Sequence, residues 1–521
     1  MRVELGGDLK IYDIRRQVIN ISGLPTQGAV FSHRNTVGNI LWAGRERVHG
    51  TIVNGTWEPT LLPDEQYATR DMLIFRRKVV AYAGTDYLPL THSEYCEQVV
   101  GGAKRKRYER AMENVRKHGL KATAARVQGF LKAEKWVEEK APRVISPRSP
   151  EYLLCTGAYI APLEKRLYRA VAGVVGHESI MKGFSLGDRG SVLNSHWQSF
   201  KKPYAVGLDA SKFDQHVSVP ALQFEHGFYL GCYGGCAELK SLLDKQLVNR
   251  IECRCEDGVV RWVTKGSRMS GDTNTASGNC LISAAMLYSW AKHAGVEIRA
   301  VVDGDDCVAI MEEEDVPRFL NGLQLWYRHR GFRMRVENQT GYFEKLVFCQ
   351  SQPVWTGEKW VMVRNPVKAI TQDHAWIARG GITHLEILQA TGEGGVALYG
   401  NIPVLGAYYR MLRGRGKLSK RAKREMHNEA CWLRHFKGDY VKDHVVSIEA
   451  RVSFCLAFGI LPSEQKRYEE YFSTFDLAGA LTRLLGTTHQ EQRAHLTNIL
   501  RFHSTLLNDL TDEHGTGWEK Q

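Results

Sequence analysis

The sequence contains no apolar run long enough to cross a bilayer. The longest runs, YLLCTGAYIAPL and SFCLAFGIL, are well below the roughly 20 residues that a transmembrane helix needs. The first residues, MRVELGGDLK, lack the basic-then-apolar pattern of a secretory signal peptide. Cysteine is sparse, with 11 residues in 521, which argues against a disulfide-stapled scaffold. These absences predict a reducing, cytosolic setting and no intrinsic transmembrane segment.

Other familiar patterns are also missing. The sequence has no internal repeat, no low-complexity segment and no G-x-x-x-x-G-K-[ST] phosphate-binding loop, which argues against an NTPase or helicase. The cysteine pairs in CYGGC (Cys232, Cys236) and CRC (Cys253, Cys255) offer four thiolates. A C-x-C spacing is poor for one tetrahedral zinc ion, so we favour buried free thiols over a structural zinc site.

Acidic residues are fewer than basic ones. The chain has 57 Asp and Glu against 70 Lys and Arg, a net charge of +13, which favours a polyanionic partner such as nucleic acid or an acidic membrane surface. Residues 101–140 contain twelve Lys or Arg and five Asp or Glu. Residues 401–424 contain eight Lys or Arg and no Asp or Glu. Each cluster alone is compatible with a solvated helix face or a nuclear-import signal. Because the two clusters bracket an acidic centre, they favour a channel for a phosphate backbone.

The middle of the chain alternates between strand and helix patterns. At 521 residues, two or three lobes are expected. The expected order is a strand (204–209), a helix (275–295), an acidic hairpin (299–312), an amphipathic helix ending at Gly331 (316–331) and a strand (332–337). This order predicts an α+β sheet with helices on one face, followed after about residue 365 by a mostly helical lobe.

Three carboxylates are placed to meet at one edge of this sheet. Asp209 ends the first strand, and Asp305 and Asp306 lie at the tip of the hairpin RAVVDGDDCVAIME, which also contains Asp303. If the strand pairs with the hairpin, Asp209, Asp305 and Asp306 converge. Their negative charges then repel one another, and bound cations would relieve this repulsion. Hard oxygen ligands suit two Mg²⁺ ions, which can activate a hydroxyl and stabilise a leaving pyrophosphate. The pattern predicts nucleotidyl transfer.

The motifs DASKFD, SGDTNTASGN and GDD, in this order, resemble motifs A, B and C of viral RNA-dependent RNA polymerases. The wider text FLKAEKW…APRVISPRSPEY…KRLYRAV is similar to the replicases of tombusvirus-like positive-strand plant viruses. The resemblance covers about residues 130–352, and more loosely begins at HRNTVGNILWAGRERV. It implies an α+β right-hand fold of fingers, palm and thumb, with an antiparallel palm sheet and a mostly helical thumb. It also implies RNA-templated addition of NTPs to an RNA 3′-hydroxyl with two Mg²⁺ ions, for which Mn²⁺ is a substitute.

The resemblance implies a division of the chain into six segments. These are an N-terminal extension with fingertips (1–100), fingers with the basic motif F (101–200), palm with motif A (201–225), a fingers insertion (226–265), palm with motifs B to E (266–364), and thumb with a C-terminal tail (365–521).

The resemblance also assigns residues. Asp209 and Asp305 are the implied catalytic metal ligands, assisted by Asp306. The implied nucleotide-binding residues are Asp214, Thr275 and Asn279 at the ribose, Ser270 beside them, and Lys132, Lys135, Arg143 and Arg148 at the triphosphate. The implied RNA-binding residues are Gly271 at the templating nucleotide, Cys349, Gln350 and Ser351 in the motif E hairpin FEKLVFCQS, and Arg421 and Arg424 in the second basic cluster.

One departure concerns motif D, where the family commonly has a lysine proposed to protonate pyrophosphate. Here the strand reads FRMRVEN, with Arg333 and Arg335. Arginine does not release protons at ordinary pH, so charge stabilisation is the expected role of Arg335.

Two alternatives are weighed beside the polymerase. A non-catalytic RNA-binding replication scaffold is disfavoured by the intact carboxylates, and a reverse transcriptase by Asp214, where a bulky residue would exclude the 2′-hydroxyl. The expected partners are viral RNA template, nascent RNA, NTPs and a membrane-anchored viral auxiliary protein. The expected location is the host cytoplasm, at membrane-bound replication complexes.

Overall fold

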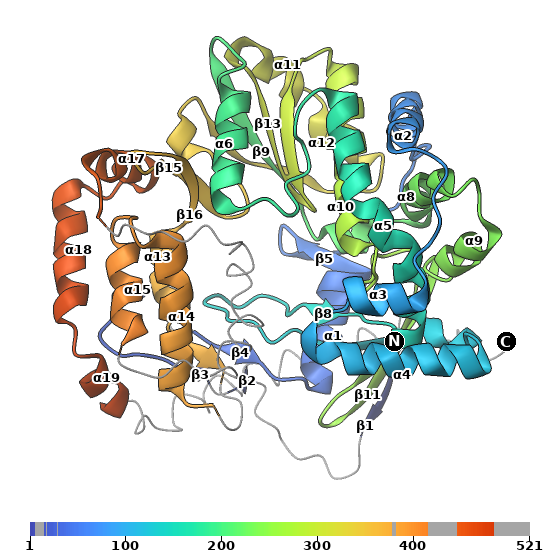
Figure 1. The fold of residues 1–521 in the computed structure, drawn as a ribbon, viewed down its shortest axis with the longest axis horizontal. Coiled ribbons are helices and arrows are strands. Elements are labelled where there is room, and N and C mark those ends of the chain that lie inside the picture. Colours follow the sequence, from blue (N-terminus) through green and yellow to red (C-terminus); the bar gives the residue numbers. More distant parts are fainter. Residues whose placement is uncertain (6–14, 17, 29, 378–381, 415–444, 484–521) are drawn as a thin grey trace.

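The structure, a computed structural model, describes residues 1–5, 15–16, 18–28, 30–377, 382–414 and 445–483 (Figure 1). At its centre lies a four-stranded antiparallel sheet with the strand order β12-β13-β9-β14. Its strands are β9 (Pro203–Ala210), β12 (Arg299–Asp303), β13 (Asp306–Glu312) and β14 (Met334–Thr340). The predicted strands and the predicted acidic hairpin are confirmed.

Both faces of this sheet are buried. Val302 and Ala309 pack into a core with α5 (Pro150–Val175), α8 (Val219–Cys232) and α10 (Thr275–Ala294). Val301 and Val308 belong to a second core that contains α6 (Leu186–Trp197). Figure 1 shows α6 beside the strands β9 and β13. The expectation of helices on one face is therefore wrong. The almost continuous apolar run of β13 is typical of a strand covered on both sides.

Glycines explain where two helical segments end. The predicted helix at 275–295 is confirmed as α10, which Gly295 terminates at φ +65°. The predicted single helix at 316–331 is instead two short helices, α11 (Val316–Leu320) and α12 (Leu323–Arg328). Gly322 separates them at φ +81°, a conformation that an α-helix does not accommodate.

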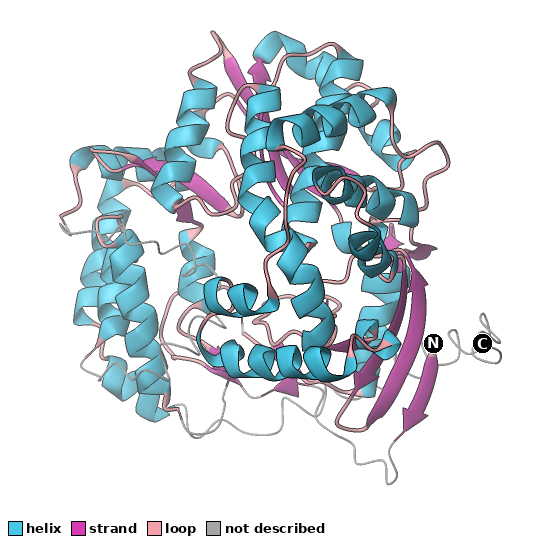
Figure 2. Ribbon diagram, turned by 45° about the vertical axis from the view of Figure 1, so that its right-hand side comes forward, coloured by secondary structure: helices cyan, strands magenta, loops and turns pink. Residues whose placement is uncertain are grey.

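A second sheet joins three distant parts of the chain at the edge of the molecule (Figure 2). Its five strands follow the order β1-β11-β10-β7-β8, with bounds Arg2–Leu5, Gly258–Lys265, Val248–Arg254, Val127–Leu131 and Val144–Ile145. Its core includes side chains of α1 (Val37–Gly44) and the thiol of Cys253, whereas Cys232 packs in the core beside the central sheet. The four cysteines weighed for zinc are divided between these two regions. Cys232 and Cys253 are buried, as the preferred interpretation expected, whereas Cys236 and Cys255 are half-buried.

Helices flank this second sheet and the central one. They include, besides the helices already named, α2 (Arg70–Ala83), α3 (His92–Gln98), α4 (Arg105–His118) and α9 (Ala237–Asp244). Among the described residues, none of the helices combines the length and apolarity that membrane crossing requires.

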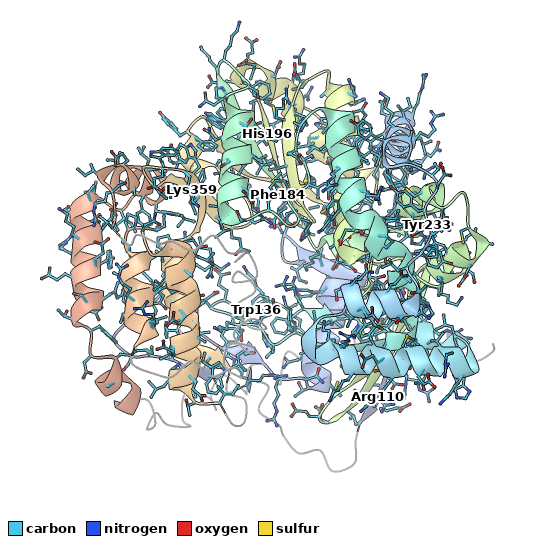
Figure 3. All side chains as sticks on the ribbon, in the orientation of Figure 1. Arg110, Trp136, Phe184, His196, Tyr233 and Lys359 are labelled. Carbon is cyan, nitrogen blue, oxygen red and sulfur yellow. The ribbon has the colours of Figure 1, made fainter. Side chains whose placement is uncertain are left out.

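The C-terminal part is mostly helical, as predicted, and lies at one side of the molecule in Figure 1. After the hairpin β15 (Ser351–Trp355) and β16 (Trp360–Arg364), the described helices are α13 (Pro366–Gln372), α14 (His384–Tyr399), α15 (Leu405–Arg413), α17 (Ile448–Phe458), α18 (Pro462–Thr474) and α19 (Leu477–Arg483). The short strand β17 (Trp376–Ile377) pairs with β3 (Val18–Ile19), so the N-terminal segment reaches this part. Figure 3 shows Trp136 in the span between these helices and α3 and α4.

Candidate active site

The structure brings the three predicted carboxylates together. Asp209 of β9 lies directly opposite Asp306 of β13, and Asp305 occupies the turn before β13. Asp209 is half-buried, and Asp305 and Asp306 are exposed. Partial desolvation, together with the charges of Asp305, Asp303 and Asp209, raises the pKa of Asp306 to about 7. The pKa of Asp305 is raised by the same desolvation and by Asp209. The carboxylates therefore destabilise one another's charged forms.

These groups fit a divalent cation in charge and donor chemistry. Carboxylate oxygens are the hard ligands that such ions prefer, and an ion between them would relieve their repulsion. Among the described residues, however, no three His, Cys, Asp or Glu side chains are already placed as a ligand cluster. The positions of the side chains as they stand do not form a complete metal site.

Asp303, the third acid of the hairpin, has a different role. Its side chain is 8% exposed and forms ion pairs with Lys182 and with Nη2 of Arg189, the latter at 2.5 Å. These two cations lower the pKa of Asp303 despite its burial. The structure thus fixes the hairpin through an ion-pair network that the sequence analysis missed. No local spacing connects residues 182 and 189 with residue 303, so no sequence signal pointed to it.

The predicted sugar-sensing pair is formed. Nδ2 of Asn279, on α10, donates to Oδ1 of Asp214 at 2.9 Å. Arg268 holds the amide from the other side, because its Nε donates to Oδ1 of Asn279 at 3.0 Å. Arg268 is itself fully buried and paired with Glu225 at 2.6 Å. Burial raises the pKa of Asp214, and the Asn279 hydrogen bond opposes this rise. Sequence reasoning did not identify the supporting Arg268–Glu225 pair.

The loop before α10 is clamped against the extended segment at 146–147. Oγ of Ser270 accepts from the backbone N–H of Ser146 at 3.1 Å, and the Thr275 hydroxyl donates to the Met269 carbonyl at 2.8 Å. A Cβ on Gly271 would lie 2.5 Å from Cα of Pro147. Both hydroxyls are thus engaged within the protein, and their nucleotide-binding roles stay predictions.

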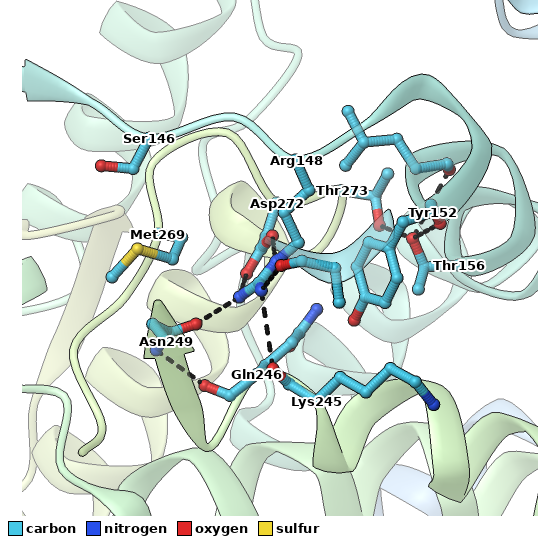
Figure 4. A network of polar contacts seen from close by, with 12 residues as sticks. Ser146, Arg148, Tyr152, Thr156, Lys245, Gln246, Asn249, Met269, Asp272 and Thr273 are labelled. Atoms are coloured by element: carbon cyan, nitrogen blue, oxygen red, sulfur yellow. Dashed lines mark hydrogen bonds and ion pairs between the residues drawn. The ribbon is translucent and has the colours of Figure 1, made fainter. Parts of the chain in front are cut away.

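The assignment of Arg148 to the triphosphate is wrong. Its side chain is 1% exposed, and its Nε pairs with Oδ1 of Asp272 at 2.6 Å (Figure 4). The same guanidinium donates to Oδ1 of Asn249 and to the carbonyl of Ala125. Arg148 therefore joins three segments of the chain inside the protein, and its guanidinium is already engaged by them.

The other basic residues of this segment divide into two groups. Lys132 and Arg143 remain partly exposed and share Glu134, with Nζ of Lys132 2.7 Å from Oε1 and Nε of Arg143 2.8 Å from Oε2. The charge of Arg143 slightly opposes the rise of the pKa of both Asp214 and Asp305, a rise that desolvation causes. Lys135 instead donates to the Gln372 carbonyl at 3.1 Å, at the end of α13. The structure thus places Lys135 at the C-terminal helices, contrary to its triphosphate assignment.

The predicted motif E hairpin is displaced. Residues 343–351 contain a short 3₁₀ turn and a tight turn with Cys349 at φ 50° and Gln350 at φ 57°, and the hairpin β15–β16 begins only at Ser351. Sγ of Cys349 faces Oδ2 of Asp303 at 3.8 Å, Gln350 accepts from Lys368, and Ser351 is 5% exposed. Ser351 faces the interior, which contradicts its RNA-binding assignment. Cys349 is half-buried and Gln350 is exposed, so their RNA-binding roles stay predictions. Arg421 and Arg424 lie outside the described residues.

Arg335 lies on β14, the strand interpreted as motif D. It lies opposite Asp209 across β9 and β14, with Nε 4.0 Å from Oδ2 of Asp209, and it donates to the hydroxyl of Ser211. It is well placed to stabilise negative charge.

The comparisons with known proteins agree with this geometry. The family model for viral RNA dependent RNA polymerase matches residues 7–479. The chain is 34% identical over 494 residues to the RNA-directed RNA polymerase of Tobacco necrosis virus (strain A), covering 93% of this chain and 67% of that protein. It is 36% identical over 413 residues to the RNA-directed RNA polymerase of Oat chlorotic stunt virus, and the match covers 75% of this chain and 54% of that protein. It is also 36% identical over 414 residues to the RNA-directed RNA polymerase of Turnip crinkle virus, and the match covers 77% of this chain and 52% of that protein.

The chain thus spans between about half and two thirds of the length of these relatives. The resemblance to tombusvirus-like polymerases that the motifs indicated is confirmed. With the model matched over nearly the whole described chain, the protein belongs to the viral RNA-dependent RNA polymerase family.

Proposed function

We propose that this chain is an RNA-templated RNA polymerase that adds NTPs to a growing RNA 3′-hydroxyl and releases pyrophosphate. The observation that carries the proposal is the position of Asp209 opposite Asp306, with Asp305 in the adjoining turn and the Asp214–Asn279 pair nearby. Acid and amide groups of this kind, in this order along the chain, suit metal-assisted phosphoryl chemistry next to a ribose.

Asp209, Asp305 and Asp306 are the groups that would hold two Mg²⁺ ions, with Mn²⁺ as a substitute. The ions, when bound, would activate the attacking hydroxyl and stabilise the leaving pyrophosphate. The protein itself would fix the carboxylate-bearing turn through the Asp303 ion pairs with Lys182 and Arg189. Arg335, whose Nε lies 4.0 Å from Oδ2 of Asp209, and the partly exposed Arg143 would balance the charge of the triphosphate.

Ribose selection would depend on the Asp214–Asn279 pair. A 2′-hydroxyl can both donate and accept, so it can satisfy a carboxylate and an amide that a deoxyribose would leave partly unpaired. The Arg268 hydrogen bond keeps the amide oriented, because it engages the Asn279 oxygen and leaves the NH₂ group directed at Asp214.

The architecture supports a right-hand assignment. The central sheet (201–225 and 266–364) would be the palm, and the helical part after residue 365 the thumb. Residues 101–200 and 226–265 would be the fingers, because both supply strands to the five-stranded sheet. Strand β1 belongs to the same sheet, which supports counting the N-terminal extension and fingertips with the fingers.

A cavity of about 640 Å³ supports an RNA path through the fingers. Its lining includes Lys104, Arg107, Tyr108, Phe130 and Gly271, which together give cations, aromatic rings and a close backbone approach. Single-stranded RNA is bound by this combination, since cations neutralise phosphates and rings stack on bases. The first basic cluster, residues 101–140, would thus guide template towards Gly271.

Partners and location complete the proposal. A membrane-anchored viral auxiliary protein would bring the chain to membrane-bound replication complexes in the host cytoplasm, where template RNA and NTPs are available. The basic surface supports the RNA part of this proposal.

Templated synthesis is the decisive test. Purified protein is mixed with RNA template, labelled NTPs or dNTPs, and Mg²⁺, with and without a primer, and the products are resolved by size. We expect template-length RNA from NTPs only. Binding of RNA without any product would favour the scaffold interpretation, and equal use of dNTPs would contradict the proposed ribose selection.

A further inference from the structure

The hairpin between β12 and β13 closes with a turn of two residues, Gly304 and Asp305. Asp303 and Asp306 pair across the two strands, so only these two residues are left to reverse the chain. Gly304 is buried and has a φ of +83°, whereas Asp305 is exposed. Because the two residues share a peptide bond, whatever fixes the backbone of Gly304 also limits where the carboxylate of Asp305 can lie.

Two side chains of α10 hold the backbone of Gly304. Oγ of Ser283 donates to the Gly304 carbonyl at 2.7 Å, and the Gly304 N–H donates to Sγ of Cys280 at 3.2 Å. Residues three apart lie on the same face of a helix, so both partners come from one face of α10. Ser283 is 6% exposed and Cys280 0%. The turn is therefore attached to the helix through both polar groups of one buried residue.

The residue next to Cys280 on α10 is Asn279, which donates to Oδ1 of Asp214 at 2.9 Å. Arg268 holds the same amide from within the core. The ribose pair and the partners of the turn thus occupy little more than one turn of the same helix. A displacement of the turn relative to the ribose pair would have to distort this segment of α10 or break one of these hydrogen bonds.

The same helix also contains a serine with a comparable contact elsewhere. Ser289 is likewise buried, and its hydroxyl lies 2.7 Å from that of Thr69, the residue that caps the start of α2. This hydrogen bond is as short as that of Ser283, but it connects α10 with a helix outside the proposed site. If such contacts only stabilised the fold, loss of either hydroxyl would have the same consequences.

We propose that Cys280 and Ser283 are positioning residues that couple ribose recognition to metal binding. By holding Gly304 on the helix that carries Asn279, they keep the carboxylate of Asp305 in register with the sugar-sensing pair. A ribose bound at Asn279 and a divalent cation bound at Asp305 would then stabilise the same placement of α10 and the turn. Such coupling is reciprocal, so the correct sugar raises the affinity for the cation and the cation raises the preference for the correct sugar. This inference rests on the proposed function.

The test removes each side-chain partner of Gly304. Ser283→Ala and Cys280→Ala remove the partners, whereas Ser283→Thr retains a hydroxyl donor and Cys280→Ser retains an acceptor. Ser289→Ala, the same substitution at a buried, hydrogen-bonded position of the same helix, is the matched control. Single-nucleotide addition is measured on a preformed primer–template with NTPs and with dNTPs over a range of free Mg²⁺. Thermal unfolding over the same Mg²⁺ range, without nucleotide, measures cation binding independently of activity.

We expect Ser283→Ala and Cys280→Ala to need about tenfold more Mg²⁺ for half-maximal NTP addition and for half of the Mg²⁺-dependent rise in melting temperature. This is the lower end of the usual effect of residues that orient metal ligands. The NTP/dNTP ratio of kcat/KM should fall as well, although neither side chain belongs to the sugar-sensing pair. Ser283→Thr and Cys280→Ser should return both quantities towards wild type. Ser289→Ala should lower the melting temperature but leave the Mg²⁺ requirement and the ratio unchanged.

The wild-type protein and a double variant test the coupling in a second way. Wild type should need less free Mg²⁺ for half-maximal addition with NTPs than with dNTPs, because the ribose favours the cation-binding placement of the turn. In the Asn279→Asp background this difference should disappear, and Ser283→Ala should then no longer lower the NTP/dNTP ratio.

Equal changes of the Mg²⁺ requirement in Ser283→Ala and Ser289→Ala would overturn the inference, because they would indicate a general loss of stability. An increased requirement with an unchanged NTP/dNTP ratio would also overturn it, since the turn would then be supported without being coupled to the sugar. If the variants do not fold, an equal wild-type requirement with NTPs and dNTPs is the contradicting result. Absence of templated synthesis by wild type with Mg²⁺ or Mn²⁺ would contradict the proposed function itself, whereas synthesis without these Mg²⁺ effects contradicts the coupling alone.

Discussion

The acidic hairpin separates two uses of aspartate that the sequence presents as one run. Asp303 is paired with cations inside the protein, whereas Asp305 and Asp306 are left facing Asp209 with raised pKa values. Mutually repelling groups of this kind are typical of sites where a ligand or the chemistry requires them. The free energy stored in this repulsion is available for binding a cation.

Asp305→Ala should therefore abolish synthesis while leaving the fold and RNA binding almost intact. Asp305 is exposed in a turn and its side chain contributes little to packing. Mg²⁺ should raise the melting temperature of the wild-type protein, by a stabilisation approaching 2.7 kcal/mol at about 100 times the dissociation constant, and this increase should be lost in the variant. Asp244→Ala, on the exposed end of α9, is the control. Retention of more than a few per cent of activity would contradict the metal-ligand role.

The Asp214–Asn279 pair leads to a separate expectation. Asp214→Asn and Asn279→Asp should each lower the NTP/dNTP ratio of kcat/KM at least tenfold, equivalent to about 1.4 kcal/mol of transition-state discrimination. The reason is that each change reverses a donor or acceptor in a hydrogen-bonded chain that begins at Arg268. Single-nucleotide incorporation with both substrates measures the ratio, and Asn321→Asp, in an exposed loop, is the isosteric control. An equal loss with NTPs and dNTPs would mean that the pair supports the fold alone.

At the scale of elements, periodicity and glycine placement predicted the strands, the hairpin and α10. The sequence did not predict which side of the sheet is covered, because α6 and the β15–β16 hairpin reach it from distant positions. Nor did the sequence predict that Arg148 is buried, since the motif PRVISPR does not distinguish a buried arginine from one that binds a ligand. Its partners Asp272 and Asn249 are far away along the chain.

The break between α11 and α12 can be tested directly. Gly322→Ala should lower the free energy of unfolding by about 1 kcal/mol. The positive φ is less favourable for alanine than for glycine, although there is space for the added Cβ. Synthesis should be unchanged, because the break lies outside the proposed site. Gly187→Ala, within α6, is the matched change at an ordinary helical position and should be neutral or slightly stabilising. Thermal unfolding of both variants gives the comparison, and equal effects would show that the backbone conformation at Gly322 is not the cause.

At the scale of the whole molecule, the basic residues that give the net charge of +13 differ in their surroundings. Many basic residues of the first cluster have acidic partners: Arg116 and Lys117 share Glu113, and Arg105 pairs with Glu109. Lys104 and Arg107 instead line the cavity that Gly271 also lines. Their positions, and not the total charge, should determine how RNA binds.

Salt dependence distinguishes these two groups of cations. RNA affinity should fall with salt with a log–log slope of roughly −0.7 per phosphate contacted. Replacing Lys104 and Arg107 together by glutamine should weaken binding and make the slope shallower by about one to two such contacts, whereas Arg116→Gln with Lys117→Gln should leave the slope unchanged. Equilibrium titration of labelled single-stranded RNA from 50 to about 300 mM salt measures the slope. If the two double variants change it equally, RNA is attracted by the overall charge of residues 104–117, and the cavity is not the path of the template.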